Sequence, residues 1–224
     1  GAGEMALDVR DQLERNELLQ DEAYRRTFRK FYRDKLSPRV WQRDFGDATI
    51  LGCPDQTLVG RNFSELAAER GVHVVDFFLD TVVAHGRALR WFTVIGNHRE
   101  DRLRKMVKNP HALITFSDAG AHIRNMAFYN LPLRFLKLVW DSHQQGSPVM
   151  SLERAVHRLT GEQADWLGIE AGHIREGDRA DITIIHPEGL NQDLEQVSWA
   201  EMENFGLDRM VNRVPGCVKH VLIN

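Results

Sequence analysis

The chain has 224 residues, of which 42% are hydrophobic, so it can bury a substantial core and disorder is not the expectation. A formal net charge of -3, with acids and bases nearly balanced, gives no reason to expect a nucleic acid or an anionic membrane as a partner. No apolar run approaches the roughly 20 residues that span a bilayer, the N-terminus lacks a secretory pattern, and the cysteines cannot form a disulfide framework. A cytoplasmic protein is the simplest prediction.

A helical pattern runs from Leu7 to about Arg39 and places four aromatic side chains on one face: Tyr24, Phe28, Phe31 and Tyr32. Basic side chains lie between them: Arg25, Arg26, Arg29, Lys30, Arg33 and Lys35. This basic stripe could contact phosphates. Because acidic residues lie nearby, we prefer a solvated face opposite a buried aromatic one.

The next stretch has the alternation of an α/β protein. Strand patterns at Ala48–Leu51 and Phe92–Ile95 flank a helix capped by Asn62 and a second helix from about Asp76 to Gly86. A helix pattern at 100–107 and an apolar run at 112–116 follow. Strand, helix and strand with short loops predict a parallel sheet.

The last third changes in character. Pro132 marks the start of one helix, and Ser151 caps another whose inner stripe would contain Leu152, Ala155, Val156 and Leu159. From Gly172 onward, strand patterns alternate with polar loops, which predicts a small β domain. The start Gly1-Ala2-Gly3 and an end directly after an apolar run suggest a piece of something longer.

The candidate chemistry lies after the run at 112–116, which is typical of a strand buried on both faces. Ser117 and Asp118 follow it directly, where α/β proteins place their sites. Asp118 could simply cap a turn, or it could take a proton from a metal-bound water, and both interpretations stay open at this point. His122 and Arg124 follow on the same loop, and Asn97 follows the preceding strand; Arg124 could bind a substrate carboxylate.

Several familiar sites are missing from the sequence. There is no HxH, HExxH or finger spacing, so the chain alone displays no complete zinc site. The GxSxG elbow and the glycine-rich phosphate loops are also absent, which argues against serine hydrolase and nucleotide-binding functions. Cys53 has no visible base and is interpreted as a small buried residue.

Four motifs in order resemble the C-terminal part of the amidohydrolase superfamily: Ile114–His122, Leu152–Thr160, Ala164–Gly168 and Gly172–Ile185. The Ser-Asp-Ala-Gly-Ala-His form and the upstream Val59–Ala67 look most like the N-acyl-D-amino-acid deacylase (D-aminoacylase) branch. The specific signal is the order of the motifs over roughly residues 55 to 224.

The resemblance implies the C-terminal part of a (β/α)8 barrel plus the returning strands of a small β-sandwich. It implies a divalent metal, usually Zn²⁺, beside Asp118, which would contact the metal and carry the proton of the attacking water. The other ligands of the family belong upstream of the matched region, so most of the metal site would lie outside this chain. The implied organisation is a helical segment or insertion at 1–45, barrel elements at 46–170 and part of the sandwich at 171–224.

Our first hypothesis is a metal-dependent amidohydrolase that cleaves N-acyl-D-amino acids or related small amides. Asp118 would be its catalytic and metal-contacting residue, and substrate contacts would come from Asn97, Ser117, His122 and Arg124. A second polypeptide, or the remainder of a precursor, would complete the barrel. The alternative is a non-catalytic assembly or regulatory fragment of the same fold. Nucleic-acid binding through the basic stripe is a weaker third hypothesis, and no membrane partner is expected.

Overall fold

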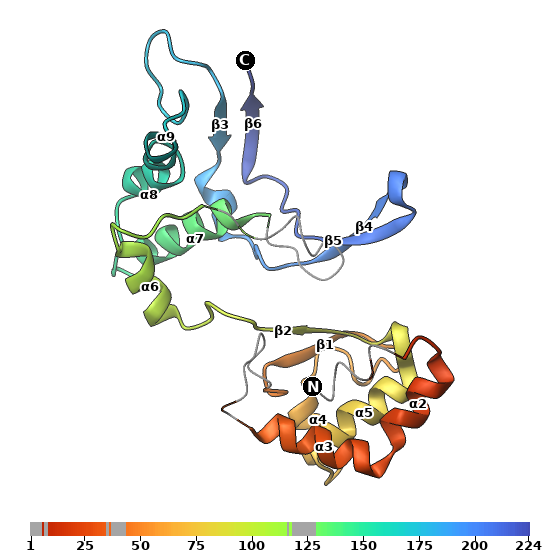
Figure 1. Ribbon diagram of the computed structural model, residues 1–224. Coiled ribbons are helices and arrows are strands. Elements are labelled where there is room, and N and C mark those ends of the chain that lie inside the picture. Colours follow the sequence, from red (N-terminus) through yellow and green to blue (C-terminus); the bar gives the residue numbers. More distant parts are fainter. Residues whose placement is uncertain (1–5, 7–8, 35, 37–43, 116, 118–128) are drawn as a thin grey trace. The chain divides into compact units, whose positions relative to one another are not determined.

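The computed structural model describes residues 6, 9–34, 36, 44–115, 117 and 129–224 (Figure 1). The chain divides into two compact units, one up to His98 and one from Arg99 onward. The domain limits expected near residues 45 and 170 remain predictions. None of the helices in the described residues is both long enough and apolar enough to cross a membrane.

The first unit begins with two helices where the sequence predicted one. They are α2 (Gln12–Gln20) and α3 (Glu22–Arg33), and the backbone is extended at Asp21 between them. The Asp21 side chain accepts a hydrogen bond of 2.7 Å from the amide of Tyr24 and so caps α3. Aspartate is a favoured N-cap because its carboxylate pairs with an otherwise unpaired amide. The predicted end of the pattern near Arg39 lies outside the described residues.

The aromatic face of α3 is confirmed for three of its four members. Tyr24 is buried, and Phe28 and Tyr32 pack against the same core, whereas Phe31 is 38% exposed. The ring of Tyr32 stacks on that of Phe45 with centroids 5.2 Å apart. The predicted periodicity therefore places α3 correctly on the core of this unit.

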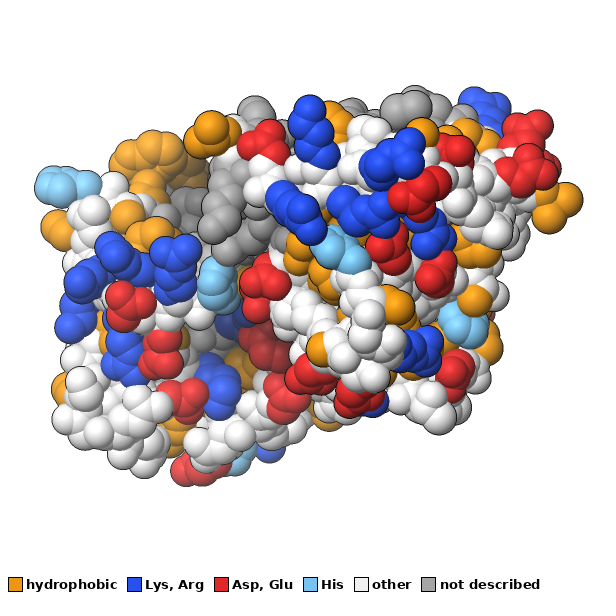
Figure 2. Space-filling model, turned by 90° about the horizontal axis from the view of Figure 1, so that it is seen from below, with side chains coloured by type: hydrophobic (Ala, Val, Ile, Leu, Met, Phe, Trp, Pro, Cys, Tyr) orange, Lys and Arg blue, Asp and Glu red, His pale blue; other side chains and the backbone are white. Residues whose placement is uncertain are grey.

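Two arginines of the basic stripe, Arg25 and Arg29, form close ion pairs with acidic side chains. Arg29 contacts Asp76 at 2.6 Å and Glu22 at 2.5 Å, and Arg25 contacts Asp80 at 2.5 Å. On the face seen in Figure 2, Lys and Arg side chains lie among Asp and Glu side chains. This arrangement favours the solvated, charge-paired interpretation over a phosphate-binding surface.

Two further helices and a strand pair complete the first unit. They are β1 (Ala48–Gly52), α4 (Phe63–Glu69), α5 (Val74–His85), the 3₁₀ helix η1 (Gly86–Ala88) and β2 (Arg90–Thr93). The predicted cap is confirmed, because the Asn62 side chain accepts from the Glu65 amide at 2.8 Å. Helix α5 begins two residues earlier than predicted, since His73 Nδ1 accepts from the Val75 amide at 3.2 Å. It ends, as predicted, at Gly86.

The described residues of the second unit form the helices α6 (Glu100–Lys108), α7 (Leu131–Gln144), α8 (Leu152–Leu159) and α9 (Gly161–Leu167). Four strands and two 3₁₀ helices follow: β3 (Ile182–Ile185), η2 (Pro187–Asn191), β4 (Ser198–Met202), η3 (Glu203–Phe205), β5 (Leu207–Val211) and β6 (Val218–Leu222). The predicted Ser151 cap is confirmed, with its hydroxyl accepting from the Arg154 amide at 3.1 Å. The predicted β character of residues 171–224 is likewise confirmed.

The prediction of a parallel sheet is wrong for the strands that the structure describes. The pairs β1–β2, β3–β6 and β4–β5 are each two-stranded and antiparallel, and Figure 1 shows β4–β5 as a ribbon separate from β3–β6. Residues 112–115 pair with no strand in the described part of the chain. Their carbonyls are partly occupied by side chains, as shown below. The barrel and the sandwich therefore remain predictions from the resemblance.

The Asn62 cap generates a prediction about stability. Asn62→Ala leaves the first-turn amide of Glu65 without its acceptor, so we expect the free energy of unfolding of the native gene product to fall by about 1 kcal/mol. Urea denaturation measures this change. Asn62→Asp is the matched control, because it keeps an oxygen at the same place and should leave the stability nearly unchanged. Equal stability of the Ala variant and the wild type would contradict the cap.

Candidate functional site

Three of the predicted site residues, Asp118, His122 and Arg124, lie outside the described residues. Ser117 is described and half-buried, and the run 112–115 lies just before it in the sequence. Asn97 is exposed and has a positive φ of 58°, a conformation that asparagine tolerates better than most residues. Because Asn97 belongs to the first unit and Ser117 to the second, a site shared by them remains a prediction.

The extended run before Ser117 is less buried than predicted. Ala112, Leu113 and Ile114 are half-buried and Thr115 is exposed, which corrects the expectation of a strand covered on both faces. Ile114 packs against the core of the second unit. Covering both faces requires helices on each side of a continuous sheet, and the described strands form no such sheet here.

Arg158 of α8 reaches the backbone that leads into this run. Its side chain is 1% exposed and donates hydrogen bonds to the carbonyls of Val107 and Ala112, and to that of Asn109 at 3.1 Å. Its Nε donates to Glu162 Oε1 at 3.1 Å. From α9, Gln163 Nε2 donates to the carbonyl of Ile114. Two side chains from α8 and α9 thus hold the run that precedes Ser117.

Sequence reasoning did not single out Arg158. The predicted inner stripe of α8 contained Val156, which is 48% exposed, and Arg158 lies in the buried position instead. The sequence did contain a signal for this ion pair, namely a glutamate, Glu162, four residues after Arg158. In the structure the two side chains pair at 3.1 Å.

The residues that follow segment 118–128 are held by the β region. Tyr129 Oη donates to the carbonyl of Met210, and Asn130 Nδ2 donates to that of Leu194 at 2.8 Å. Asn212 Nδ2 donates to Asn130 Oδ1 at 2.8 Å, and both asparagines are buried. The segment that carries Asp118 is therefore flanked on both sides by hydrogen-bonded backbone or side chains.

A histidine pair lies at the junction of α8 and α9. The rings of His157 and His173 have centroids 6.4 Å apart, and His173 Nε2 donates to Asp165 Oδ1 at 2.8 Å. This hydrogen bond, with the nearby histidine and arginine charges, holds the pKa of the Asp165 carboxyl below its ordinary value. Within the described ranges, no three His, Cys, Asp or Glu side chains come together as metal ligands. These residues alone do not make the metal site that the resemblance implies.

Both cysteines are free and buried. Cys217 Sγ donates to the carbonyl of Gly189 at 3.0 Å, and burial raises the pKa of its thiol. A thiol of raised pKa is a poor nucleophile at neutral pH. Burial of Cys53 agrees with its interpretation as a core residue.

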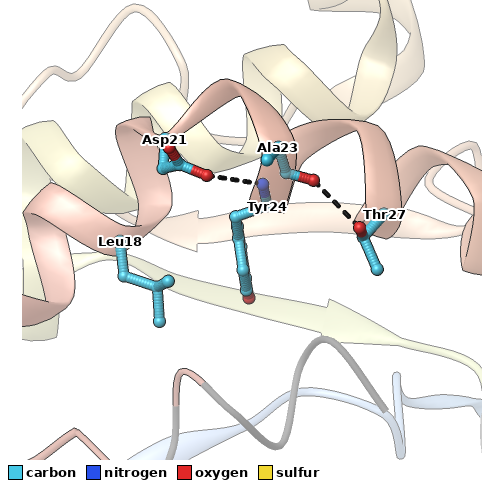
Figure 3. A pocket seen from close by; sticks show the side chains of 5 residues that line it. All are labelled: Leu18, Asp21, Ala23, Tyr24 and Thr27. Carbon is cyan, nitrogen blue, oxygen red and sulfur yellow. Dashed lines mark hydrogen bonds between the residues drawn. The ribbon is translucent and has the colours of Figure 1, made fainter.

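A cavity of about 230 Å³ lies beside α2 and α3, between Leu18, Tyr24 and Thr27 (Figure 3). Its carboxylate, that of Asp21, already accepts from the Tyr24 amide, and the Thr27 hydroxyl donates to the Ala23 carbonyl at 2.9 Å. The polar groups of this cavity therefore serve the helix, and the cavity offers no catalytic pair.

No protein-family model matches the sequence. Uncharacterized proteins of Mycobacterium tuberculosis and Mycobacterium bovis are 52% identical over 216 residues, which are 95% of this chain and 35% of the relatives. The chain thus spans about a third of the length of the curated relatives it matches.

Solved structures of D-aminoacylase, an enzyme described as one of the amidohydrolases, resemble part of the fold. One is 22% identical with a TM-score of 0.45 and covers 79% of this chain, which corresponds to 33% of that enzyme. Another, from work on the binuclear metal centre of D-aminoacylase, is 19% identical with a TM-score of 0.43 over the same shares.

The Asp165–His173 pair generates a prediction about pH. In His173→Ala the Asp165 carboxyl loses its hydrogen-bond donor, so its pKa should rise toward the ordinary value of about 3.9. A carboxyl whose pKa is lowered in the folded state stabilises the fold above the unfolded pKa, and this contribution is lost as the pH falls through the folded value. Side-chain carboxyl NMR titration measures the pKa. His157→Ala is the control and should cause a smaller rise; an unchanged pKa in His173→Ala would exclude the pair.

Proposed function

We propose that this chain supplies the proton-carrying aspartate, Asp118, of a metal-dependent hydrolase that cleaves the amide bond of N-acyl-D-amino acids or related amides. The observation that carries the proposal is the ordered set of four motifs between Ile114 and Ile185. Hydrogen bonds at Ile114, before segment 118–128, and at Asn130, after it, support the proposal, because a proton-carrying group would need fixed supports on the chain around it.

Asp118 has the chemistry that amide hydrolysis needs. As a carboxylate it accepts a proton from the water whose oxygen attacks the carbonyl carbon, and it then gives a proton to the leaving nitrogen as the C–N bond breaks. Substrate contacts would come from Asn97, Ser117, His122 and Arg124. The guanidinium of Arg124 matches a carboxylate in a two-point pair, as an acylated amino acid would present it.

The metal is part of this proposal, and Zn²⁺ is the favoured ion. The described residues form no set of metal ligands, and the proposal places most of the ligands outside this chain. Relatives about three times as long as the matched region leave room for them. A cytoplasmic location also belongs to the proposal.

Asp118→Asn tests the function directly. An amide cannot accept the proton, so we expect kcat/KM for N-acyl-D-amino acids to fall at least about 100-fold in the native gene product with any companion present. A coupled assay of free amino acid release measures it. Asp178→Asn, which changes an exposed carboxylate of the same unit, is the control and should retain full activity.

Metal analysis of the same preparations completes this experiment. A preparation that contains zinc and loses activity only in Asp118→Asn supports the hydrolase. Absence of zinc, together with unchanged activity in Asp118→Asn, would instead favour the non-catalytic assembly or regulatory module.

The second unit exposes large apolar side chains that a companion would cover: Trp166, Leu167, Ile169, Ile174, Val221 and Ile223. Exposed apolar surface on this scale, together with strand edges, is typical of an interface. We therefore expect this chain to purify natively within a longer polypeptide or a complex. Light scattering on the native preparation measures the mass, and a stable, monodisperse species of this chain alone would contradict the expectation.

A further inference from the structure

Most hydrogen-bond donors of the Arg158 guanidinium are occupied, chiefly by backbone carbonyls between the end of α6 and residue 112. Arginine has five N–H donors, and four of them are occupied here, by Glu162 and by the carbonyls of Val107, Asn109 and Ala112. At 1% exposure, an arginine without such partners would be costly to bury. The position of α8 is thus tied to that of the backbone at 107–112.

The acceptors of Arg158 belong to two different elements. Val107 and Asn109 lie at the C-terminal end of α6, where the last carbonyls have no partner within the helix and a cation is favoured by the helix dipole. Ala112 begins the extended run. A single side chain therefore sets the spacing between the end of α6 and the start of that run.

Gln163 extends the same contact along the run. Its Nε2 donates to the carbonyl of Ile114 and, at 3.1 Å, to that of Arg158 itself. Arg158 and Gln163 thus donate to two carbonyls of the run that lie two residues apart in the sequence, Ala112 and Ile114.

We infer that Arg158 is a positioning residue: it fixes the start of the run 112–115, which directly precedes the Ser117-Asp118 pair in the sequence, through backbone carbonyls. This inference rests on the proposed role of Asp118. Because Arg158 is 1% exposed and its recorded contacts are to Glu162 and to backbone carbonyls, its effect would pass through the backbone. A small displacement of a reacting group lowers the rate more than it lowers substrate binding.

Arg158→Lys tests the inference. Lysine keeps the positive charge, but its ammonium group has three donors and cannot replace the planar guanidinium that bonds three carbonyls and a carboxylate. In the native gene product, we expect amide hydrogen exchange in peptides covering 109–117 to become faster. We also expect kcat for amide hydrolysis to fall at least about tenfold, with KM changed less than about twofold.

Arg154→Lys is the matched control. Arg154 lies on the same helix and also pairs with Glu162, but its recorded hydrogen bonds go to Glu162 and His157 and not to the run. It should leave exchange at 109–117 and kcat unchanged. Gln163→Ala is a second variant, which removes only the Ile114 contact from the run and should produce a smaller effect of the same kind.

The outcomes separate the two proposals. Unchanged amide exchange at 109–117 in Arg158→Lys, or an equal change in Arg154→Lys, would overturn the inference that Arg158 fixes the run 112–115. Faster exchange with unchanged kcat would overturn the positioning role. A wild-type protein without amidase activity would overturn the proposed function and the assignment to Asp118, while the exchange measurements would still decide whether Arg158 holds the run.

Discussion

Burial of the Arg158 guanidinium imposes the constraint on which the second unit depends. An ionised group removed from water must have its hydrogen bonds replaced, and here backbone carbonyls and Glu162 replace them. Those carbonyls are themselves groups that need donors when buried. Because each side satisfies the other, α8 cannot move away from the end of α6 without leaving both unpaired. The helices and the extended run therefore behave as one structural element.

Local signals predicted much of the helical structure. The caps at Asn62 and Ser151 and the glycine at 86 begin or end helices where the sequence analysis placed them. A cap depends on a side-chain bond to an amide two or three residues away, and a glycine stop depends on the glycine's own backbone freedom, so both are visible in a short stretch of sequence. The break at Asp21 belongs to the same kind of signal, but the sequence was interpreted as one continuous helical pattern from Leu7 to about Arg39, which runs across it.

Pairing over long distances in the sequence was not predicted. The side chain of Arg29 meets Asp76 47 residues later, and Arg158 meets the carbonyl of Ala112 46 residues earlier. In the second case the acceptor is a backbone carbonyl, so the residue type at position 112 gives no indication of the hydrogen bond. The prediction of a parallel sheet failed for a related reason. The order strand, helix, strand in the sequence does not specify which strand edges are free to pair. β1 in fact pairs with β2 in antiparallel register.

The ion pairs of the described acidic residues also bear on which carboxylate is proposed as the catalytic one. Asp76 is held by Arg29, Glu162 by Arg158 and Arg154, and Asp165 by His173. A carboxylate that neutralises a neighbouring cation or accepts a fixed hydrogen bond stabilises the fold, and it is less available to exchange protons with water and substrate. Asp118 is the carboxylate that the sequence motifs single out for the proposed reaction. Before its segment, Gln163 donates to the backbone carbonyl of Ile114, and after it the Asn130 side chain donates to the carbonyl of Leu194. Fixed supports on the chain before and after a proton carrier are what repeated proton transfer would require.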